Sequence, residues 1–204
     1  MTDGFLNKAY GVRDADSVRE LYDDWAATYE AEIADNGYAT PGRCAAALAL
    51  HVTDQSAPIL DFGCGTGLSG LALKLAGFEA IDGVDVSADM LKGAESKGIY
   101  RTLSQIEPGE DLPGTPGDYA AIAAIGVIGA GAAPIEVFDT LMHGLDRGGL
   151  LVLSLNDHAL ADPANEAKLS EWMDCGAARL LMWEYGPHLP GIDLKANVYV
   201  IEKA

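Results

Sequence analysis

The chain has 204 residues, of which 49% are hydrophobic and 7% aromatic, so it can form one globular domain with a sizeable core. Its 13 basic and 31 acidic residues give a formal net charge of −18, which opposes binding to nucleic acid backbones and anionic membranes. No apolar run approaches the roughly 20 residues that span a bilayer. We therefore expect neither a nucleic-acid partner nor a membrane association.

The sequence also bears on location, metals and assembly. Residues 1–4 contain neither a basic patch nor an apolar core, so we expect no signal peptide. Three widely spaced cysteines without a CxxC pair, Cys44, Cys64 and Cys175, favour a reduced, cytoplasmic protein. Histidine, cysteine and acidic residues show no metal-ligand spacing, which predicts no metal site. We expect a monomer or a homodimer.

The N-terminal quarter is predicted to be helical. Apolar residues recur at three- and four-residue steps over residues 14–34, the pattern of an amphipathic helix. A second helix is predicted over residues 41–51, with Thr40 as its cap, because proline suits the first turn of a helix. We therefore divide the chain into an N-terminal helical cap, residues 1–52, and a core, residues 53–204.

Strands and helices alternate through the core. The predicted strands are 58–62, 79–84, 99–106, 119–125, 150–155, 177–185 and 195–202. The predicted helices are 67–76, 87–98, one that opens at Pro134, and 162–174. This alternation predicts right-handed βαβ units and a parallel sheet. Only a short loop around residues 187–191 joins the last two strands, and since no crossover helix fits there, they should form an antiparallel hairpin.

The most informative segment is residues 59–67, where an apolar run leads into an acid and three alternating glycines follow. This pattern predicts a buried strand, a tight glycine turn and the start of a helix. Glycines have no side chains, so a ligand can approach the backbone closely. The carboxylate of Asp61 would repel a pyrophosphate at this turn, so the ligand should carry positive charge or hydroxyl groups there.

Class I S-adenosylmethionine-dependent methyltransferases carry a glycine motif that resembles Asp61-Phe62-Gly63-Cys64-Gly65-Thr66-Gly67. Their cofactor has a sulfonium and an ammonium group and no phosphate. Residues 80–87 resemble the family's second strand, which ends in an acid, here Asp85. The resemblance implies S-adenosylmethionine as cofactor and an α/β, Rossmann-like three-layer sandwich. Its seven-stranded, mostly parallel sheet should end in an antiparallel C-terminal hairpin.

Residues 22–29 are similar to an N-terminal element of small-molecule methyltransferases. The nearest likeness is to the Williams–Beuren-region methyltransferase-like group and its bacterial relatives. In such proteins this helix lies over the cofactor and closes the pocket, which implies cofactor contacts for Trp25 and Tyr29. The alternative is that both aromatic residues are core residues on an apolar stripe.

The same resemblance implies the contacts of the glycine turn. Gly63, Gly65 and Gly67 should face the methionine part of the cofactor, with Cys64 as a small, inert residue between them. Asp61 should hold the turn and, directly or through water, the amino-acid end. The alternative is that the turn needs glycine for its geometry alone.

Asp85 should accept hydrogen bonds from both ribose hydroxyls, since a carboxylate offers two oxygens, and Val86 should pack against the adenine. Alternatively, Asp85 is an ordinary acid near a helix N-terminus. Ile106 and Glu107 occupy the loop that meets the adenine amino group in the family, and Gly126 could contact the cofactor through its carbonyl. Two further acids of that loop compete with Glu107 for this role, Glu110 and Asp111.

Methyl transfer needs mainly alignment of nucleophile, carbon and sulfur and exclusion of water. Should the acceptor lose a proton, His158 is the candidate base, because it follows strand 150–155 and strand carboxyl ends face the ligand. The alternative is a surface histidine. Residues 124–131 are small and apolar and lack the Asn/Asp-Pro-Pro-Tyr motif, which favours an apolar or roomy pocket. We expect direct in-line transfer to a small-molecule acceptor.

Two other functions remain open from the sequence. Residues 65–70 fit the pattern G-x-G-x-x-G of an NAD(P)-dependent oxidoreductase, although these glycines start late after the strand and Asp61 is unsuited to a pyrophosphate. The absence of a clear base also allows a non-catalytic S-adenosylmethionine-binding protein that acts as a sensor or partner.

Overall fold

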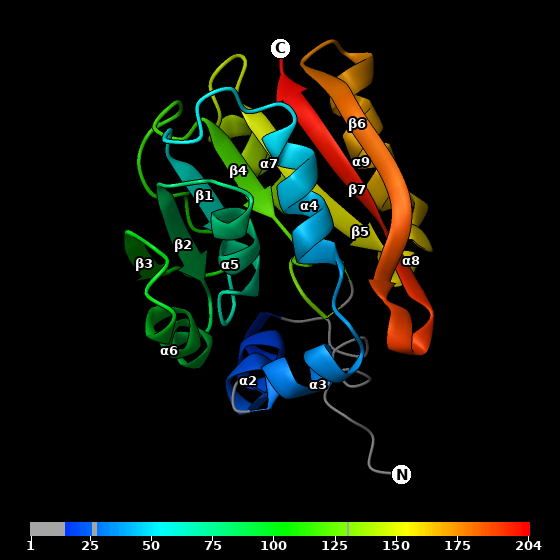
Figure 1. The fold of residues 1–204 in the computed structure, drawn as a ribbon. Coiled ribbons are helices and arrows are strands. Elements are labelled where there is room, and N and C mark those ends of the chain that lie inside the picture. The colour runs from blue at the N-terminus through cyan, green and yellow to red at the C-terminus, as the bar shows by residue number, and fades with distance from the viewer. Residues whose placement is uncertain (1–14, 26–27, 130) are drawn as a thin grey trace.

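Seven strands form one sheet in the order β3-β2-β1-β4-β5-β7-β6 (Figure 1). The computed structural model describes residues 15–25, 28–129 and 131–204. The parallel strands are β1 (Ile59–Phe62), β2 (Ile81–Asp85), β3 (Thr102–Gln105), β4 (Ala121–Ala124) and β5 (Leu150–Asn156). The antiparallel strands are β6 (Ala178–Leu189) and β7 (Leu194–Lys203), with β7 between β5 and β6. The predicted Rossmann-like fold with its C-terminal hairpin is therefore confirmed.

The centre of the sheet is apolar because it is covered on both faces. Every residue of β1, β4 and the first six positions of β5 is buried. Parallel strands with both faces covered read as continuous apolar runs, and residues 119–125 show this pattern in the sequence. Asp61 interrupts the run in β1, where it pairs in register with Gly83 and Ala123.

Helices cover both faces of the sheet. On one face lie α4 (Thr40–Ala49) and α5 (Leu68–Leu75), whose buried residues share a core cluster with β1, β4 and β7. Helix α6 (Ala88–Ser96) contacts β2 and β3 at the sheet's edge. On the other face α7 (Val137–His143) and α9 (Pro163–Asp174) pack on a second cluster, and the short α8 (Asp157–Leu160) follows β5. Among the described residues, no helix is long and apolar enough to cross a membrane.

Two short helices lie across the carboxyl ends of the parallel strands (Figure 1). They are α2 (Ala15–Trp25) and α3 (Tyr29–Asp35), so the single helix predicted over residues 14–34 is wrong. The amide of Thr28 donates to the carbonyl of Trp25 at 2.9 Å, a three-residue spacing that closes a turn where the helix would have continued. Residues 14, 26 and 27 lie outside the described part of the chain.

The C-terminal hairpin holds the chain between α3 and α4. The amide of Ala39 donates to the carbonyl of His188 at 2.9 Å, and the amide of Gly191 donates to the carbonyl of Asn36 at 3.0 Å. Arg43 donates to the carbonyls of Pro187 and Ala196. Helix α4 thus packs with the sheet and hairpin, although it lies before the boundary at residue 52 that we predict between cap and core.

Some element boundaries differ from those predicted. Helix α4 begins at Thr40 with Ala39 at its N-cap, because the Thr40 hydroxyl is hydrogen-bonded to Nδ1 of His188 at 2.8 Å instead of capping the helix. Strand β6 runs through Pro187, which an edge strand tolerates, so the hairpin turns later than predicted, at Pro190–Ile192. Strands β3 and β4 and helix α7 are shorter than predicted.

The bond between Thr40 and His188 should stabilise the junction of hairpin and cap. Both side chains are buried, and burial lowers the pKa of His188 to about 4. Thr40→Val keeps the side-chain shape but leaves the imidazole nitrogen without its partner, so it should lower the free energy of unfolding by about 1–3 kcal/mol. Urea denaturation at pH 7 measures this. The exposed Thr53→Val is the matched control, and equal effects of the two substitutions would contradict the prediction.

Candidate functional site

The glycine turn connects the end of β1 to the start of α5. Gly63, Gly65 and Gly67 have φ angles of 67°, 53° and 93°, which residues with side chains rarely adopt. The amides of Gly63 and Cys64 donate to the carbonyl of Val84 at 2.8 and 3.0 Å, which fixes the turn against β2. A Cβ on Gly63 would lie 2.5 Å from the Val127 side chain. The turn therefore needs glycine for both its backbone angles and its close packing.

Asp85 is the last residue of β2 and faces the glycine turn. One carboxylate oxygen accepts from the amide of Gly65 at 2.8 Å, and the other accepts from the amide of Ser87 at 2.9 Å. The residue is 9% exposed, and burial raises the pKa of its carboxyl group. Since each carboxylate oxygen can accept a second hydrogen bond, both oxygens can still receive hydroxyl groups from a ligand.

Asp61 lies beneath the turn, fully buried. One of its carboxylate oxygens accepts from the hydroxyls of Ser69 and Tyr100, each at 2.7 Å. Burial raises the pKa of Asp61 to about 7. The Tyr100 ring reaches this carboxylate only because Gly70 and Gly83 have no side chains, since a Cβ on Gly70 would lie 2.2 Å from the Tyr100 hydroxyl.

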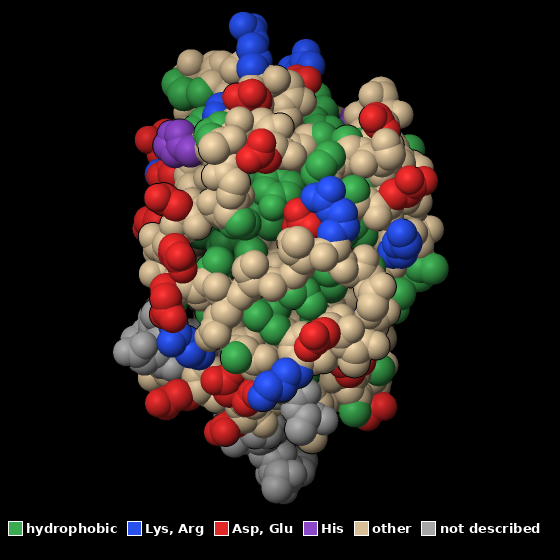
Figure 2. All heavy atoms as spheres, turned by 90° about the vertical axis from the view of Figure 1, so that its left-hand side faces the viewer, with side chains coloured by type: hydrophobic (Ala, Val, Ile, Leu, Met, Phe, Trp, Pro, Cys, Tyr) green, Lys and Arg blue, Asp and Glu red, His purple; other side chains and the backbone are tan. Residues whose placement is uncertain are grey.

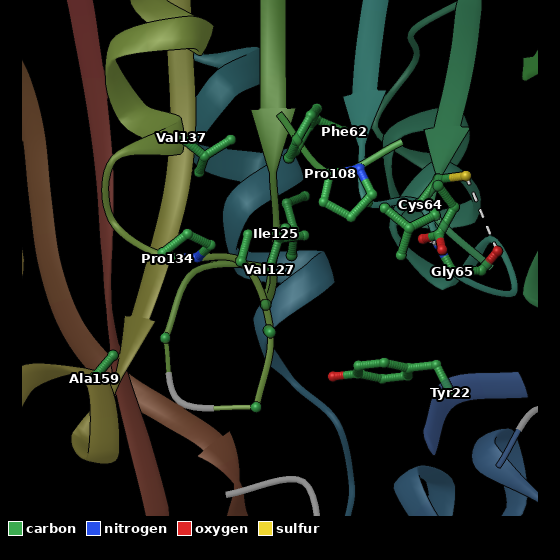
Figure 3. A pocket seen from close by; sticks show the side chains of 18 of the residues that line it. Tyr22, Phe62, Cys64, Gly65, Pro108, Ile125, Val127, Pro134, Val137 and Ala159 are labelled. Atoms are coloured by element: carbon green, nitrogen blue, oxygen red, sulfur yellow. Dashed lines mark hydrogen bonds between the residues drawn. The ribbon is translucent and has the colours of Figure 1, made fainter. Parts of the chain in front are cut away.

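A cavity of about 960 Å³ opens at the carboxyl ends of the parallel strands, next to the glycine turn. This volume lies at the upper end of the range of small-molecule and cofactor sites. In Figure 3, Cys64 and Gly65 lie on one side of it, and Pro134, Val137 and Ala159 lie on the other. The predicted site residues that line it are Tyr29, Gly63, Cys64, Gly65, Asp85, Val86, Ile106, Glu107, Gly126 and His158.

Three predicted contact residues do not line this cavity. Trp25 is 2% exposed and packs in a cluster with Ile33 and Met90, so it supports the cap from within. Asp61 lies beneath the turn, and Gly67 is the N-cap of α5. Their position beside the cavity gives them a supporting role, whereas the residues above form its wall.

The structure defines the surroundings of the other predicted residues. Glu107 is exposed and forms an ion pair with Arg19 of α2, which links the loop after β3 to the cap. His158 is on the short helix α8, which begins directly after β5 because the Asn156 side chain accepts from the amide of Ala159 at 3.0 Å and caps that helix. Its side chain remains at the cavity wall.

Two tyrosines in the cavity wall were not predicted. Tyr22 of α2 lies across the cavity from Ile125 and Val127 (Figure 3). The Tyr38 hydroxyl occupies the space where a Cβ on Gly126 would lie, only 2.3 Å from it. Tyr22 belongs to the same periodic apolar pattern as Tyr29, so that pattern could have indicated it. Tyr38 lies outside any periodic segment, so no sequence pattern indicates it.

Backbone and acidic side chains surround the part of the cavity next to the glycine turn. Among the residues that the structure describes, no group of three or more His, Cys, Asp or Glu side chains could hold a metal ion. The glycine turn brings backbone close to the ligand space, and the two buried carboxylates beside it disfavour a phosphate. A positively charged or uncharged ligand therefore suits this part of the cavity better than a pyrophosphate does.

Residues 37–190 match the sequence profile described as a methyltransferase domain. The chain therefore belongs to the methyltransferase domain family, whose usual cofactor is S-adenosylmethionine.

Three curated relatives differ in what they are named for. Human methyltransferase-like protein 27 is 35% identical over 152 residues, which are 73% of this chain and 62% of that protein. Trans-aconitate 2-methyltransferase of Rhizobium etli is 29% identical over 109 residues, or 53% of this chain and 41% of that protein. The 18S rRNA (guanine(1575)-N(7))-methyltransferase of Saccharomyces cerevisiae is 29% identical over 126 residues, or 55% and 46%. The chain thus spans less than two thirds of each.

Solved structures share the fold at low sequence identity. A magnesium protoporphyrin IX methyltransferase from Synechocystis PCC 6803, solved with bound S-adenosylmethionine, superimposes with a TM-score of 0.61 at 17% identity. The match covers 98% of this chain and 90% of that one. A putative methyltransferase in complex with the Haloferax volcanii Trm112 activator gives a TM-score of 0.69 at 14% identity, covering 91% and 97%.

The buried Asp61 should make stability depend on pH. Its native pKa of about 7 exceeds the value of about 4 in an unfolded chain, so the native state binds more protons between these values and loses stability as pH rises through this range. Asp61→Asn removes the titration. Its free energy of unfolding relative to the wild type should therefore rise by about 1–4 kcal/mol from pH 4 to pH 7.

Urea denaturation at several pH values measures this difference. The exposed Asp111→Asn controls for the loss of a carboxylate in general. A difference between Asp61→Asn and wild type that stays constant from pH 4 to pH 7 would rule out a buried carboxyl group with a raised pKa.

Proposed function

We propose that this protein binds S-adenosylmethionine at the glycine turn and catalyses transfer of its methyl group to a small-molecule acceptor. The residue that carries this proposal is Asp85, which lines the cavity while its two carboxylate oxygens accept hydrogen bonds from the amides of Gly65 and Ser87. A carboxylate held in this way can accept hydrogen bonds from the two hydroxyls of a ribose. When bound, the cofactor supplies an electrophilic methyl group on a sulfonium.

The chain's own residues then have distinct roles. Asp85 accepts the ribose hydroxyls, and Val86 and Ile106 pack against the adenine. The backbone of Gly63 and Gly65 lies next to the methionine part. The other proposed contacts are Tyr29, Cys64, Glu107 and Gly126, which all line the cavity. Trp25, Asp61 and Gly67 act indirectly, by holding the cap and the turn in position.

The site favours this cofactor over a dinucleotide. A pyrophosphate at the glycine turn would lie beside Asp85 and above Asp61, and like charges repel in a poorly hydrated site. The positive charges of a sulfonium and an ammonium group would instead be attracted to these acidic side chains. This contrast favours a methyltransferase over an NAD(P)-dependent oxidoreductase, although residues 65–70 fit the dinucleotide pattern.

A small acceptor fits the cavity and the surface better than a nucleic acid. The cavity lies between the sheet and the cap, and it is large enough for an acceptor beside the cofactor. The net charge is −18, and on the face at the β3 edge acidic side chains are widespread (Figure 2). A phosphate backbone would be repelled there, whereas a small molecule enters without covering the surface. Transfer then requires in-line alignment and exclusion of water by the closed cap.

Titration calorimetry followed by a turnover assay tests the proposal. The protein should bind S-adenosylmethionine and not NADH, and methyl-labelled cofactor should label a member of a metabolite panel. Binding of NADH alone would refute the methyltransferase proposal. Binding of S-adenosylmethionine without transfer to any acceptor would favour the non-catalytic alternative.

Asp85→Asn should weaken binding of S-adenosylhomocysteine, the product form of the cofactor, by about 1–3 kcal/mol. The reason is the loss of a charged acceptor for the ribose hydroxyls. Asp82→Asn is the matched control, because Asp82 lies on the same strand but pairs with Arg101 and does not line the cavity. For the S-adenosylhomocysteine analogue that lacks the 2′-hydroxyl, the difference in affinity between the variant and the wild type should be smaller. An equal loss of affinity for both ligands would count against ribose recognition.

His158→Gln should lower kcat by about 10²–10⁴-fold for an acceptor that loses a proton during attack, because a positioned base contributes on that scale. His143→Gln is the control, since His143 of α7 packs against Trp172 of α9 and lies outside the cavity lining. Binding of S-adenosylhomocysteine should stay unchanged in the control. If the kcat of His158→Gln equalled that of the wild type, His158 would not be the base of the reaction.

A further inference from the structure

The part of the cavity that the cofactor would leave free is apolar. If the proposed function holds, the cofactor lies along Gly65, Asp85 and Ile106, and the remaining wall comes from the segment after β4 and from α7 and α8. In Figure 3 this wall is formed by the side chains of Ile125, Val127, Pro134, Val137 and Ala159. Its shape therefore suits an acceptor with an apolar body.

Besides His158, neutral side chains of this wall can form hydrogen bonds. Thr140 of α7 and Asn165 of α9 both line the cavity. Asn165 is 7% exposed, and its amide nitrogen donates to the carbonyl of Ala159 at 2.7 Å. Such groups can orient an acceptor, but neither can neutralise a buried negative charge.

The formal charges of the lining are negative. Among the described residues, the lining contains no lysine or arginine, while its acids are Asp85, Glu107, Glu110, Glu136 and Asp162. Four of these acids are exposed at the mouth of the cavity, and in the described chain only Glu107 forms an ion pair with a basic side chain, Arg19. An anionic acceptor would pass this acidic rim and meet no lysine or arginine among the described residues of the lining.

The side of the cavity that the cap forms also disfavours an anionic acceptor. Tyr22, Tyr29 and Tyr38 line it, and Tyr22 lies across the cavity from the apolar wall (Figure 3). The faces of tyrosine rings attract cations and accept apolar groups, and they repel anions. Thus both sides of the free space discriminate against a carboxylate.

We infer that the methyl acceptor is an uncharged or cationic small molecule with an apolar body, and that polycarboxylates are excluded. This inference rests on the proposed function, since it assigns the free part of the cavity to the acceptor. Burying an unpaired carboxylate costs several kcal/mol, and here no lysine or arginine of the described lining offsets that cost. The cavity therefore selects the methyl acceptor by its charge as well as by its shape.

Calorimetry with three naphthalene probes tests the inference. The protein is first saturated with S-adenosylhomocysteine at pH 8, where an ordinary histidine side chain is neutral. It is then titrated with 2-naphthol, 2-naphthylmethylamine and 2-naphthoate, which share one ring system and differ in charge. The neutral and cationic probes should bind about tenfold or more tightly than the anion, and trans-aconitate should compete with neither.

A pair of variants at Val137 gives an independent readout. Val137→Lys places a cation in the apolar wall and should tighten 2-naphthoate binding about tenfold or more, whereas the uncharged Val137→Met should not. Equal affinities for the three probes, tighter binding of the anion, or no gain in Val137→Lys would overturn the inference. A protein that fails to bind S-adenosylhomocysteine would instead refute the proposed function, so the two failures are distinguishable.

Discussion

The hydrogen bonds of Asp85 determine the geometry of the whole site. One carboxylate joins the amide of Gly65, in the turn after β1, to the amide of Ser87, in the turn after β2. Two neighbouring strands therefore end in loops that share a single acceptor. Because Asp85 also lines the cavity, the residue that joins the two turns is the one that we propose to bind the ribose. Binding requires little rearrangement of a carboxylate that is already held on both sides.

A second buried acidic side chain lies beneath the glycine turn. Asp61 accepts hydroxyls from Ser69 and Tyr100, which connects β1 to α5 and to the segment before β3. Glycines at positions 70 and 83 make room for the tyrosine ring. The glycines of this region thus serve two purposes, because some shape the ligand's turn and others let a polar network reach the sheet's interior. A substitution at a glycine of the turn would change the turn's backbone directly, whereas a substitution at Gly70 or Gly83 would displace the Tyr100 ring.

The sequence predicted the parts of the fold that local patterns specify. The glycine turn and Asp85 were found because a strand, an acid and glycines occur at fixed spacing, and the hairpin was found because its loop is too short for a crossover. The turn after Trp25 is local, but no glycine or proline within residues 14–34 marks it in the sequence. The bond from Thr40 to His188 was missed because it joins distant segments. Tyr38 was missed for the same reason, because its role follows from Gly126, far along the chain.

The position of β7 has a consequence for the order in which the protein assembles. This strand is the last in the chain, yet it lies between β5 and β6, and the hairpin it forms holds the backbone at Asn36 and Ala39. During synthesis the glycine motif emerges early, but β5 keeps one unpaired edge until β7 arrives, and the entry to α4 waits for His188 and Gly191. The contacts that hold residues 36–39 therefore form only after residues 188–191 have been made, which couples two segments far apart in the sequence in one late folding event.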